Sequence, residues 1–210
     1  SILRTNSLKM MMQSNQQWIE HPQVLTGKVV SLLPLEHSHF DELIALAGDN
    51  HIWQHYIFDA SREEVFRKSL DEALLAREKR TQYPWVIVHK PTRKLIGSTR
   101  LMDIVPEHRK LEIGWTWLTP DYWGTGINEE CKLLLLTYCF EALKTTRVLL
   151  KTDENNVRSR KAIEKIGGKF EGILRNDMIR ENGTHRNSAY YSIIDTEWTE
   201  IKKQLEKMLL

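Results

Sequence analysis

Residues 111–128 constrain the fold of this chain more than any other stretch. The segment reads LEIGWTWLTPDYWGTGIN, in which residues of alternating character lead to a glycine pair, Gly124 and Gly126. A long apolar run with helical spacing follows at once. A strand, a glycine turn and a helix start in succession suit a phosphate group, because the first N–H groups of a helix are free and carry partial positive charge. The sequence therefore predicts an anion-binding turn at residues 123–128.

Two common nucleotide motifs do not account for this turn. A dinucleotide fingerprint requires a third glycine at position 129, where this chain has Glu129, and it requires βαβ units around the turn. The Gly-Lys-Ser/Thr ending of a P-loop is absent as well. By itself the remaining Gly-x-Gly pattern is equally typical of a plain tight turn, so the wider sequence has to decide.

Hydrophobic periodicity predicts one α+β domain with a largely antiparallel central sheet. An S-x-x-E capping box at Ser61 and an Asn-Gly turn at Gly183 mark a helix start and a hairpin. In the strand before the glycine turn, strict alternation places Trp115 and Trp117 on the same face as Leu111. Strands are expected at residues 24–35, 85–89, 95–101, 110–118, 147–152, 170–180 and 188–194, and helices at about 38–47, 61–79, 127–143 and 156–166.

The 210 residues suit a single domain, for which we expect an N-terminal extension at 1–22, the domain at 23–200 and a helical tail at 201–210. The formal net charge of +2 does not indicate nucleic acid or an anionic membrane as a partner. No apolar run reaches membrane-spanning length, and the N-terminus lacks a signal-peptide pattern. Cys131 and Cys139 lie too far apart on one expected helix to form a disulfide. These features predict a cytoplasmic protein with reduced thiols.

Two separated motifs resemble the GNAT N-acetyltransferase superfamily, in particular its RimJ/RimL-type branch. The first is the run E-I-G-W-T-W-L-x-P-x-Y-W-G-T-G-I-N that begins at Glu112. The second begins at Asn156 and reads N-V-R-S, followed by K-I-G-G, E-G and Arg175. The resemblance extends over residues 24–198 in element order, and it implies a GNAT-like fold with an acetyl-CoA cleft beside the strand that ends near Leu118.

The resemblance also assigns residues to acetyl-CoA. The pyrophosphate would bind backbone N–H groups of the turn, although Trp123 and Asn128 depart from the usual family residues there. The pantetheine arm would pair with the strand before the turn and contact Asn156, which could equally be a simple helix N-cap. The residues implied are Trp123, Gly124, Thr125, Gly126, Ile127 and Asn128 for the pyrophosphate, and Thr116, Trp117, Leu118 and Asn156 for the pantetheine.

Acetyl transfer to an amine requires a base for the ammonium and a way to accommodate the leaving thiolate. Glu112 is the candidate base, with a salt-bridged surface glutamate as the alternative. Many GNAT enzymes carry an acidic tyrosine seven residues after the asparagine, but this chain has Ile163 there. Ser159 is the predicted substitute, and it could instead be an ordinary first-turn serine.

The acceptor amine is expected near an aromatic loop between the first two helices. Trp53, His55 and Tyr56 belong to this loop, and Trp85 could join them, although aromatic residues under a loop also form ordinary core. Scattered histidines without ligand spacing predict no metal site. The sequence thus predicts an acetyl-CoA-dependent N-acetyltransferase acting on a protein N-terminus or a small amine. The alternative is a catalytically idle CoA-binding sensor, and the oligomeric state, including a homodimer, stays open.

Overall fold

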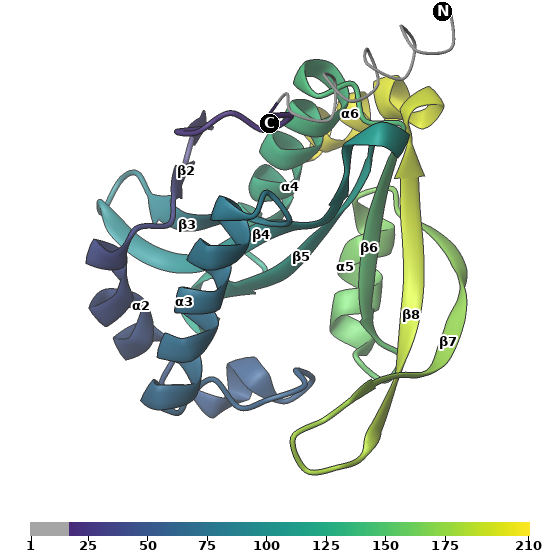
Figure 1. Cartoon of the computed structure of the whole chain (residues 1–210). Coiled ribbons are helices and arrows are strands. Elements are labelled where there is room, and N and C mark those ends of the chain that lie inside the picture. The colour runs from purple at the N-terminus through teal and green to yellow at the C-terminus, as the bar shows by residue number, and fades with distance from the viewer. Residues whose placement is uncertain (1–16) are drawn as a thin grey trace, which may run out of the picture.

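A computed structural model describes residues 17–210, and most of the expected N-terminal extension lies outside this range. Eight strands form one sheet in the order β1-β2-β3-β4-β5-β6-β8-β7 (Figure 1). Within the described part of the chain every neighbouring pair is antiparallel except β5 and β6, which are parallel. This confirms the predicted α+β class and the mostly antiparallel sheet. No helix of residues 17–210 is long and apolar enough to cross a membrane.

The elements follow the predicted order. The strands are β1 Leu25–Thr26, β2 Val30–Pro34, β3 Tyr83–His89, β4 Lys94–Val105, β5 Lys110–Leu118, β6 Arg147–Asp153, β7 Lys169–Ile179 and β8 His185–Ile194. The α-helices are α2 Phe40–Leu46, α3 Glu63–Glu78, α4 Ile127–Thr137, α5 Val157–Lys165 and α6 Trp198–Met208, and α4 continues into a π-helical turn at Tyr138–Ala142.

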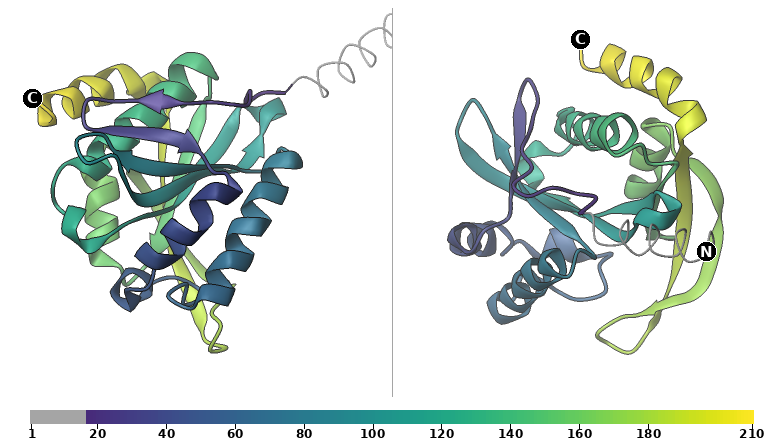
Figure 2. Two further views of the ribbon diagram at one scale, coloured as in Figure 1. Left: turned by 90° about the vertical axis from the view of Figure 1, so that its left-hand side faces the viewer. Right: turned by 45° about the horizontal axis from the view of Figure 1, so that its top comes forward.

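Helices cover both faces of the sheet and enclose two apolar cores. Helices α2 and α3 pack on one face, where Phe66 and Leu70 lie among buried residues of β3 and β5. Helices α4 and α6 cover the other face, where Leu135 and Leu205 belong to a larger core (Figure 2). Both cysteines are free and buried, because the helix that carries them packs into this larger core.

Strands β5 and β6 form a fork. Their parallel pairing covers only three residues of β5, which end at Glu112. Beyond Glu112 the two strands separate, so the edge of β5 that faces β6 is left open (Figure 1). The fork divides the sheet into β1–β5 on one side and β6–β8 on the other. Strand β5 leads directly into the turn that starts α4.

A β-bulge in β5 shapes one arm of this fork. Trp115 and Thr116 both lie opposite Thr99, because the pairings on either side use Gly114 and Trp117. Trp115 has φ of +51°, in the left-handed region that few non-glycine residues adopt. The extra residue bends β5 away from a straight path at the point where it leaves β6.

The bulge makes the predicted alternation of β5 wrong beyond its midpoint. One extra residue moves every later side chain to the opposite face. Leu111 and Ile113 contribute to the core under α4, whereas Trp117 contacts Trp53 and Phe66 in the core under α2 and α3. Period-two patterning cannot reveal such a change, because the aromatic residues fit either face.

Three other local predictions are corrected. The expected single strand at 24–35 is a hairpin, since residues 27–29 turn the chain between β1 and β2. The S-x-x-E box does not form, because α3 starts at Glu63 after Arg62, which makes no side-chain cap. The expected boundary at residue 200 falls inside α6, and that helix buries Trp198 and Ile201 against the domain.

Candidate active site

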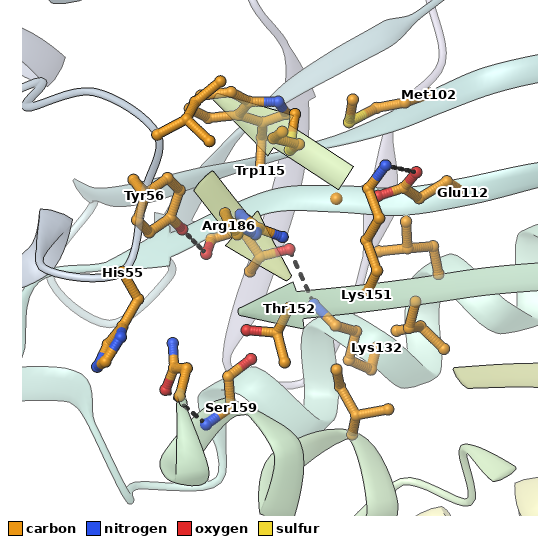
Figure 3. A pocket seen from close by; sticks show the side chains of 18 residues that line it. His55, Tyr56, Met102, Glu112, Trp115, Lys132, Lys151, Thr152, Ser159 and Arg186 are labelled. Atoms are coloured by element: carbon orange, nitrogen blue, oxygen red, sulfur yellow. Dashed lines mark hydrogen bonds and ion pairs between the residues drawn. The ribbon is translucent and has the colours of Figure 1, made fainter. Parts of the chain in front are cut away.

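A cavity of about 160 Å³ occupies the fork between β5 and β6. Both strands, the loop before α3, and helices α4 and α5 supply its walls (Figure 3). Six of the residues predicted from the sequence line this cavity together: His55, Tyr56, Glu112, Thr116, Asn156 and Ser159. The remaining predicted residues lie at the glycine turn or in the cores.

Glu112 is a buried carboxyl group in the wall of the cavity. The residue is 2 % exposed and lines the cavity, so it is not the surface glutamate of the alternative interpretation. Burial raises its pKa to about 7, Lys151 opposes this rise, and Asp103 adds to it. Lys151 Nζ lies 3.4 Å from Glu112 Oε2 (Figure 3). A carboxyl group that titrates near neutrality can both take and release a proton at physiological pH.

The glycine turn has the backbone geometry that an anion site needs. Gly124 and Gly126 have φ values of +70° and +85°, where residues with a Cβ are strained. A Cβ at Gly124 would meet no atom within 4 Å, so open space lies in front of the turn. Ile127 buries its side chain and starts α4, while Asn128 follows half-buried in the first helical turn. The N–H groups of this first turn have no intrahelical acceptor.

Trp123 acts differently from the prediction. Its backbone N–H donates to Pro120 O at 3.0 Å and is therefore already used inside the protein. Its indole Nε1 donates to Leu118 O at 2.9 Å, which ties the turn to the end of β5. The guanidinium of Arg158 stacks 3.7 Å above the ring. Trp123 thus supports the turn and holds a cation beside it.

We expect Gly124→Ala to weaken CoA binding about tenfold or more. A Cβ in the left-handed region costs roughly 1–2 kcal/mol, and the alanine would shift the backbone amides of the turn. Gly183→Ala is the matched control, because Gly183 also has positive φ (+82°) and a Cβ added there would meet no atom within 4 Å, but it lies in the β7–β8 hairpin. Calorimetric titration with CoA measures both. Equal loss of affinity in the two variants would contradict a role of the turn in binding.

Residues 116–118 form an open strand edge next to the turn. On one side Trp117 pairs with Ser98 and Leu118 with Gly97 of β4. On the other side β6 has already diverged, so an extended amide-bearing chain could add to this edge. The Tyr56 hydroxyl donates to Thr116 O at 2.6 Å and fixes the edge near the bulge.

The start of α5 completes this wall. The Asn156 side-chain oxygen accepts from Ser159 N at 3.0 Å, so the N-cap interpretation of Asn156 is right. Asn156 and Ser159 nevertheless both line the cavity, as Figure 3 shows for Ser159. The cap role leaves the asparagine amide group and the serine hydroxyl available to an occupant.

The aromatic residues divide into two groups. His55 and Tyr56 line the cavity. Trp53 and Trp85 do not reach it, and this corrects their assignment to acceptor binding. Trp53 is 4 % exposed and donates to Ala47 O, and Trp85 is fully buried and donates to the Gln23 carbonyl. Both tryptophans are core residues with satisfied N–H groups.

Several cavity residues were missed by sequence reasoning. The bulge brings Trp115 into the lining, where its ring stacks on Phe58 at 5.0 Å. Three cationic side chains also line the cavity: Lys132 from α4, Lys151 from β6 and Arg186 from β8. Side chains alternate along β6, so Lys151 could have been expected on the face opposite Leu150. Lys132, by contrast, lies in an apolar run that predicts a core position. The cavity is therefore more cationic than the net charge suggests.

A family model described as an acetyltransferase (GNAT) domain matches residues 30–169. The matched range contains β2 to β6 with α4 and α5, and thus the fork and the glycine turn. Among proteins of known sequence, YoaA of Bacillus subtilis (strain 168), an N-acetyltransferase by name, is 33 % identical over 122 residues, which are 58 % of this chain and 67 % of YoaA. YjcK of the same strain, also an N-acetyltransferase by name, is 25 % identical over 83 % of this chain and 98 % of its own.

YdaF of B. subtilis, whose name refers to a ribosomal N-acetyltransferase, is 36 % identical over 104 residues. That alignment covers 50 % of this chain and 56 % of YdaF, so the chain matches only about half of that relative.

Solved structures support the same assignment. A GCN5-related N-acetyltransferase from Brucella melitensis superposes with a TM-score of 0.83 at 26 % identity, covering 91 % of this chain and 87 % of that one. A protein from T. thermophilus described as an acetyltransferase gives 0.81 at 31 % identity over 91 % and 100 %. RimL, solved with coenzyme A, gives 0.72 at 20 % identity over 82 % and 99 %, a likeness of fold. The chain belongs to the GNAT acetyltransferase family.

Proposed function

We propose that this chain transfers an acetyl group from acetyl-CoA directly to a primary amine, on a protein N-terminus or a small molecule, within a ternary complex. One observation carries the proposal most strongly: the buried carboxyl of Glu112 lines the cavity at the point where the open edge of β5 begins. A base, an edge for the pantetheine and an anion-binding turn thus follow one another along residues 112–128.

The residues present fit acetyl-CoA. The turn at Gly124 and Gly126 offers free backbone N–H groups toward open space, and Arg158 adds a cation beside it. The edge at residues 116–118 has no strand partner on the side that β6 has left, although the carbonyls of Thr116 and Leu118 accept hydrogen bonds from the Tyr56 and Trp123 side chains. From the turn back to Glu112, these features follow the order in which acetyl-CoA joins its diphosphate, its pantetheine arm and its thioester.

In this proposal Glu112 accepts the proton of the acceptor ammonium, and the free amine then forms its bond to the thioester carbonyl carbon as the C–S bond breaks. Tyr56 and Trp115 form the aromatic wall against which the acceptor would rest. Ser159 faces the cavity from α5, where its hydroxyl can donate to the thioester group. Ile163 lines the cavity at the position where many GNAT enzymes carry an acidic tyrosine, so that role cannot fall to residue 163.

Acetyl-CoA and CoA are expected to stabilise the protein against heat, whereas NAD and ATP are not. A ligand at 100 times its Kd adds about 2.7 kcal/mol to the free energy of unfolding, which for a chain of this size raises Tm by roughly 5–10 °C. Differential scanning fluorimetry with each of the four compounds measures this. No shift with acetyl-CoA, or an equal shift with ATP, would contradict the proposal.

A panel of amines then identifies the acceptor. Peptides with free N-termini, polyamines and aminoglycosides are each incubated with the protein and acetyl-CoA, and the released thiol of CoA is measured. An enzyme releases CoA above background with at least one acceptor class. Stabilisation by acetyl-CoA with background release for every acceptor would favour the sensor alternative.

A further inference from the structure

Lys132 is a buried cation that the proposed roles above do not use. It is 6 % exposed on α4, and its side chain lines the cavity at the fork. Its Nζ donates to Thr116 Oγ1 at 2.9 Å, which is the dashed line from Lys132 in Figure 3. Thr116 Oγ1 in turn lies 2.8 Å from Thr99 Oγ1. Burying an ammonium is costly unless it is compensated, so a cavity lysine with hydroxyl contacts calls for a functional reason.

The charge of Lys132 is not matched by a carboxylate. Within residues 17–210 no acidic group lies in ion-pairing distance of its Nζ, in contrast to Lys151, which faces Glu112. Burial lowers the Lys132 pKa to about 8, and the nearby Cys131 and Glu129 only partly oppose this shift. The other charged groups of the cavity are Glu112, Lys151 and Arg186. An ammonium has three donors, so two are left for an occupant of the cavity.

The position of Lys132 matches the expected position of the sulfur. Thr116, its partner, is on the open edge of β5 between the glycine turn and Glu112. A thioester that reaches the acceptor side near Glu112 has to pass this point of the fork. Ser159 and Ile163 line the same cavity from α5, so Lys132 is the cationic donor on the helical side of the lining.

We infer that Lys132 is a catalytic residue whose ammonium stabilises the thiolate of CoA as it leaves. When the C–S bond breaks, its electron pair stays on sulfur, and the thiolate forms an ion pair with the Lys132 ammonium until CoA leaves and takes a proton from solvent. The acceptor nitrogen loses two protons: one goes to Glu112, which returns it to solvent, and the other goes to solvent as the amide forms. The inference rests on the proposed function, since it assumes that CoA occupies the fork.

The test uses CoA alone and needs no acceptor. An ammonium within a few ångströms lowers a thiol pKa by about 1–3 units from its ordinary value of about 8.5. Binding of CoA at pH 7 should therefore release about 0.2 to 0.9 of a proton beyond that released by desulfo-CoA, which lacks the thiol. Isothermal titration calorimetry in buffers of different ionisation enthalpy measures this difference.

Lys132→Met should abolish the extra proton release, and Lys132→Arg should retain it. Affinity for desulfo-CoA within about threefold of wild type shows that the fold and the turn are intact. If wild-type protein releases equal numbers of protons with CoA and desulfo-CoA, the inference is wrong although CoA binds. If neither compound binds, the proposed function itself fails. Should the methionine variant not fold, the wild-type comparison and Lys132→Arg still decide.

Discussion

Replacing Glu112 with glutamine is expected to lower kcat for acetyl transfer by about 100-fold or more while leaving the Kd for CoA within about threefold. General-base catalysis by a positioned carboxylate contributes about 10²–10⁴-fold, and glutamine keeps the volume of the side chain but cannot accept the proton. Turnover with the acceptor found in the amine panel, together with CoA titration, measures both effects. Glu112 lines the cavity away from the glycine turn, which is why CoA binding is expected to survive.

The pH dependence of the wild-type enzyme should report the same group. Glu112 must be ionised to act as base, and burial raises its pKa to about 7, so kcat/KM should rise with pH through about 7. The same ionisation lowers the stability of the fold as pH rises, whereas it raises kcat/KM. Because the folded-state pKa lies above the ordinary value of 4.5, the folded protein binds the proton more tightly, and this contribution to stability is lost as pH rises through about 7.

Glu171→Gln is the matched control for these measurements. Glu171 is also a strand glutamate, but it forms an exposed ion pair with Arg147 and is absent from the cavity lining. This variant should keep the pH–rate profile of wild type. A Glu112→Gln variant with unchanged turnover, or with the same rise in rate through pH 7, would remove Glu112 from the mechanism.

The part of the site that could be predicted from sequence is the part formed by local backbone. Glycines at 124 and 126 signal positive φ by themselves, and the apolar run after them signals a helix start. The strand before the turn has the bounds that its pattern predicts, residues 110–118. Asn156 and Ser159 were predicted from the family resemblance, and the N-cap bond that joins them spans only three residues.

The part that could not be predicted depends on long-range contacts. The bulge at Trp115 exists only relative to Thr99 on β4, so no period within β5 reveals it. Lys132 is followed in sequence by four leucines, and its place in the cavity lining becomes visible only in the fold. Trp53 and Trp85 have the composition of a binding loop, but their N–H groups find carbonyl partners that lie elsewhere in the fold.

Sequence patterning also misses Glu130, which holds the start of α4 in place. Glu130 follows the glycine turn by one helical turn and is 7 % exposed. Its carboxylate accepts from the backbone N–H groups of three consecutive residues in the β1–β2 turn, namely Lys28, Val29 and Val30. The hairpin at the sheet edge is thereby attached to the helix that carries the anion site.

Glu130→Ala is expected to lower the free energy of unfolding by about 3 kcal/mol, because it leaves backbone donors without their charged acceptor. For a chain of this size this corresponds to a Tm lower by roughly 6–12 °C. Glu129→Ala is the control: the ion-pair partner of Glu129, Lys165, is more than half exposed, so loss of this pair should cost about 1 kcal/mol or less. Since Gly124 and Gly126 are unchanged, CoA should still raise the Tm of Glu130→Ala. Equal destabilisation by the two substitutions would show that the carboxylate of Glu130 does not anchor the hairpin.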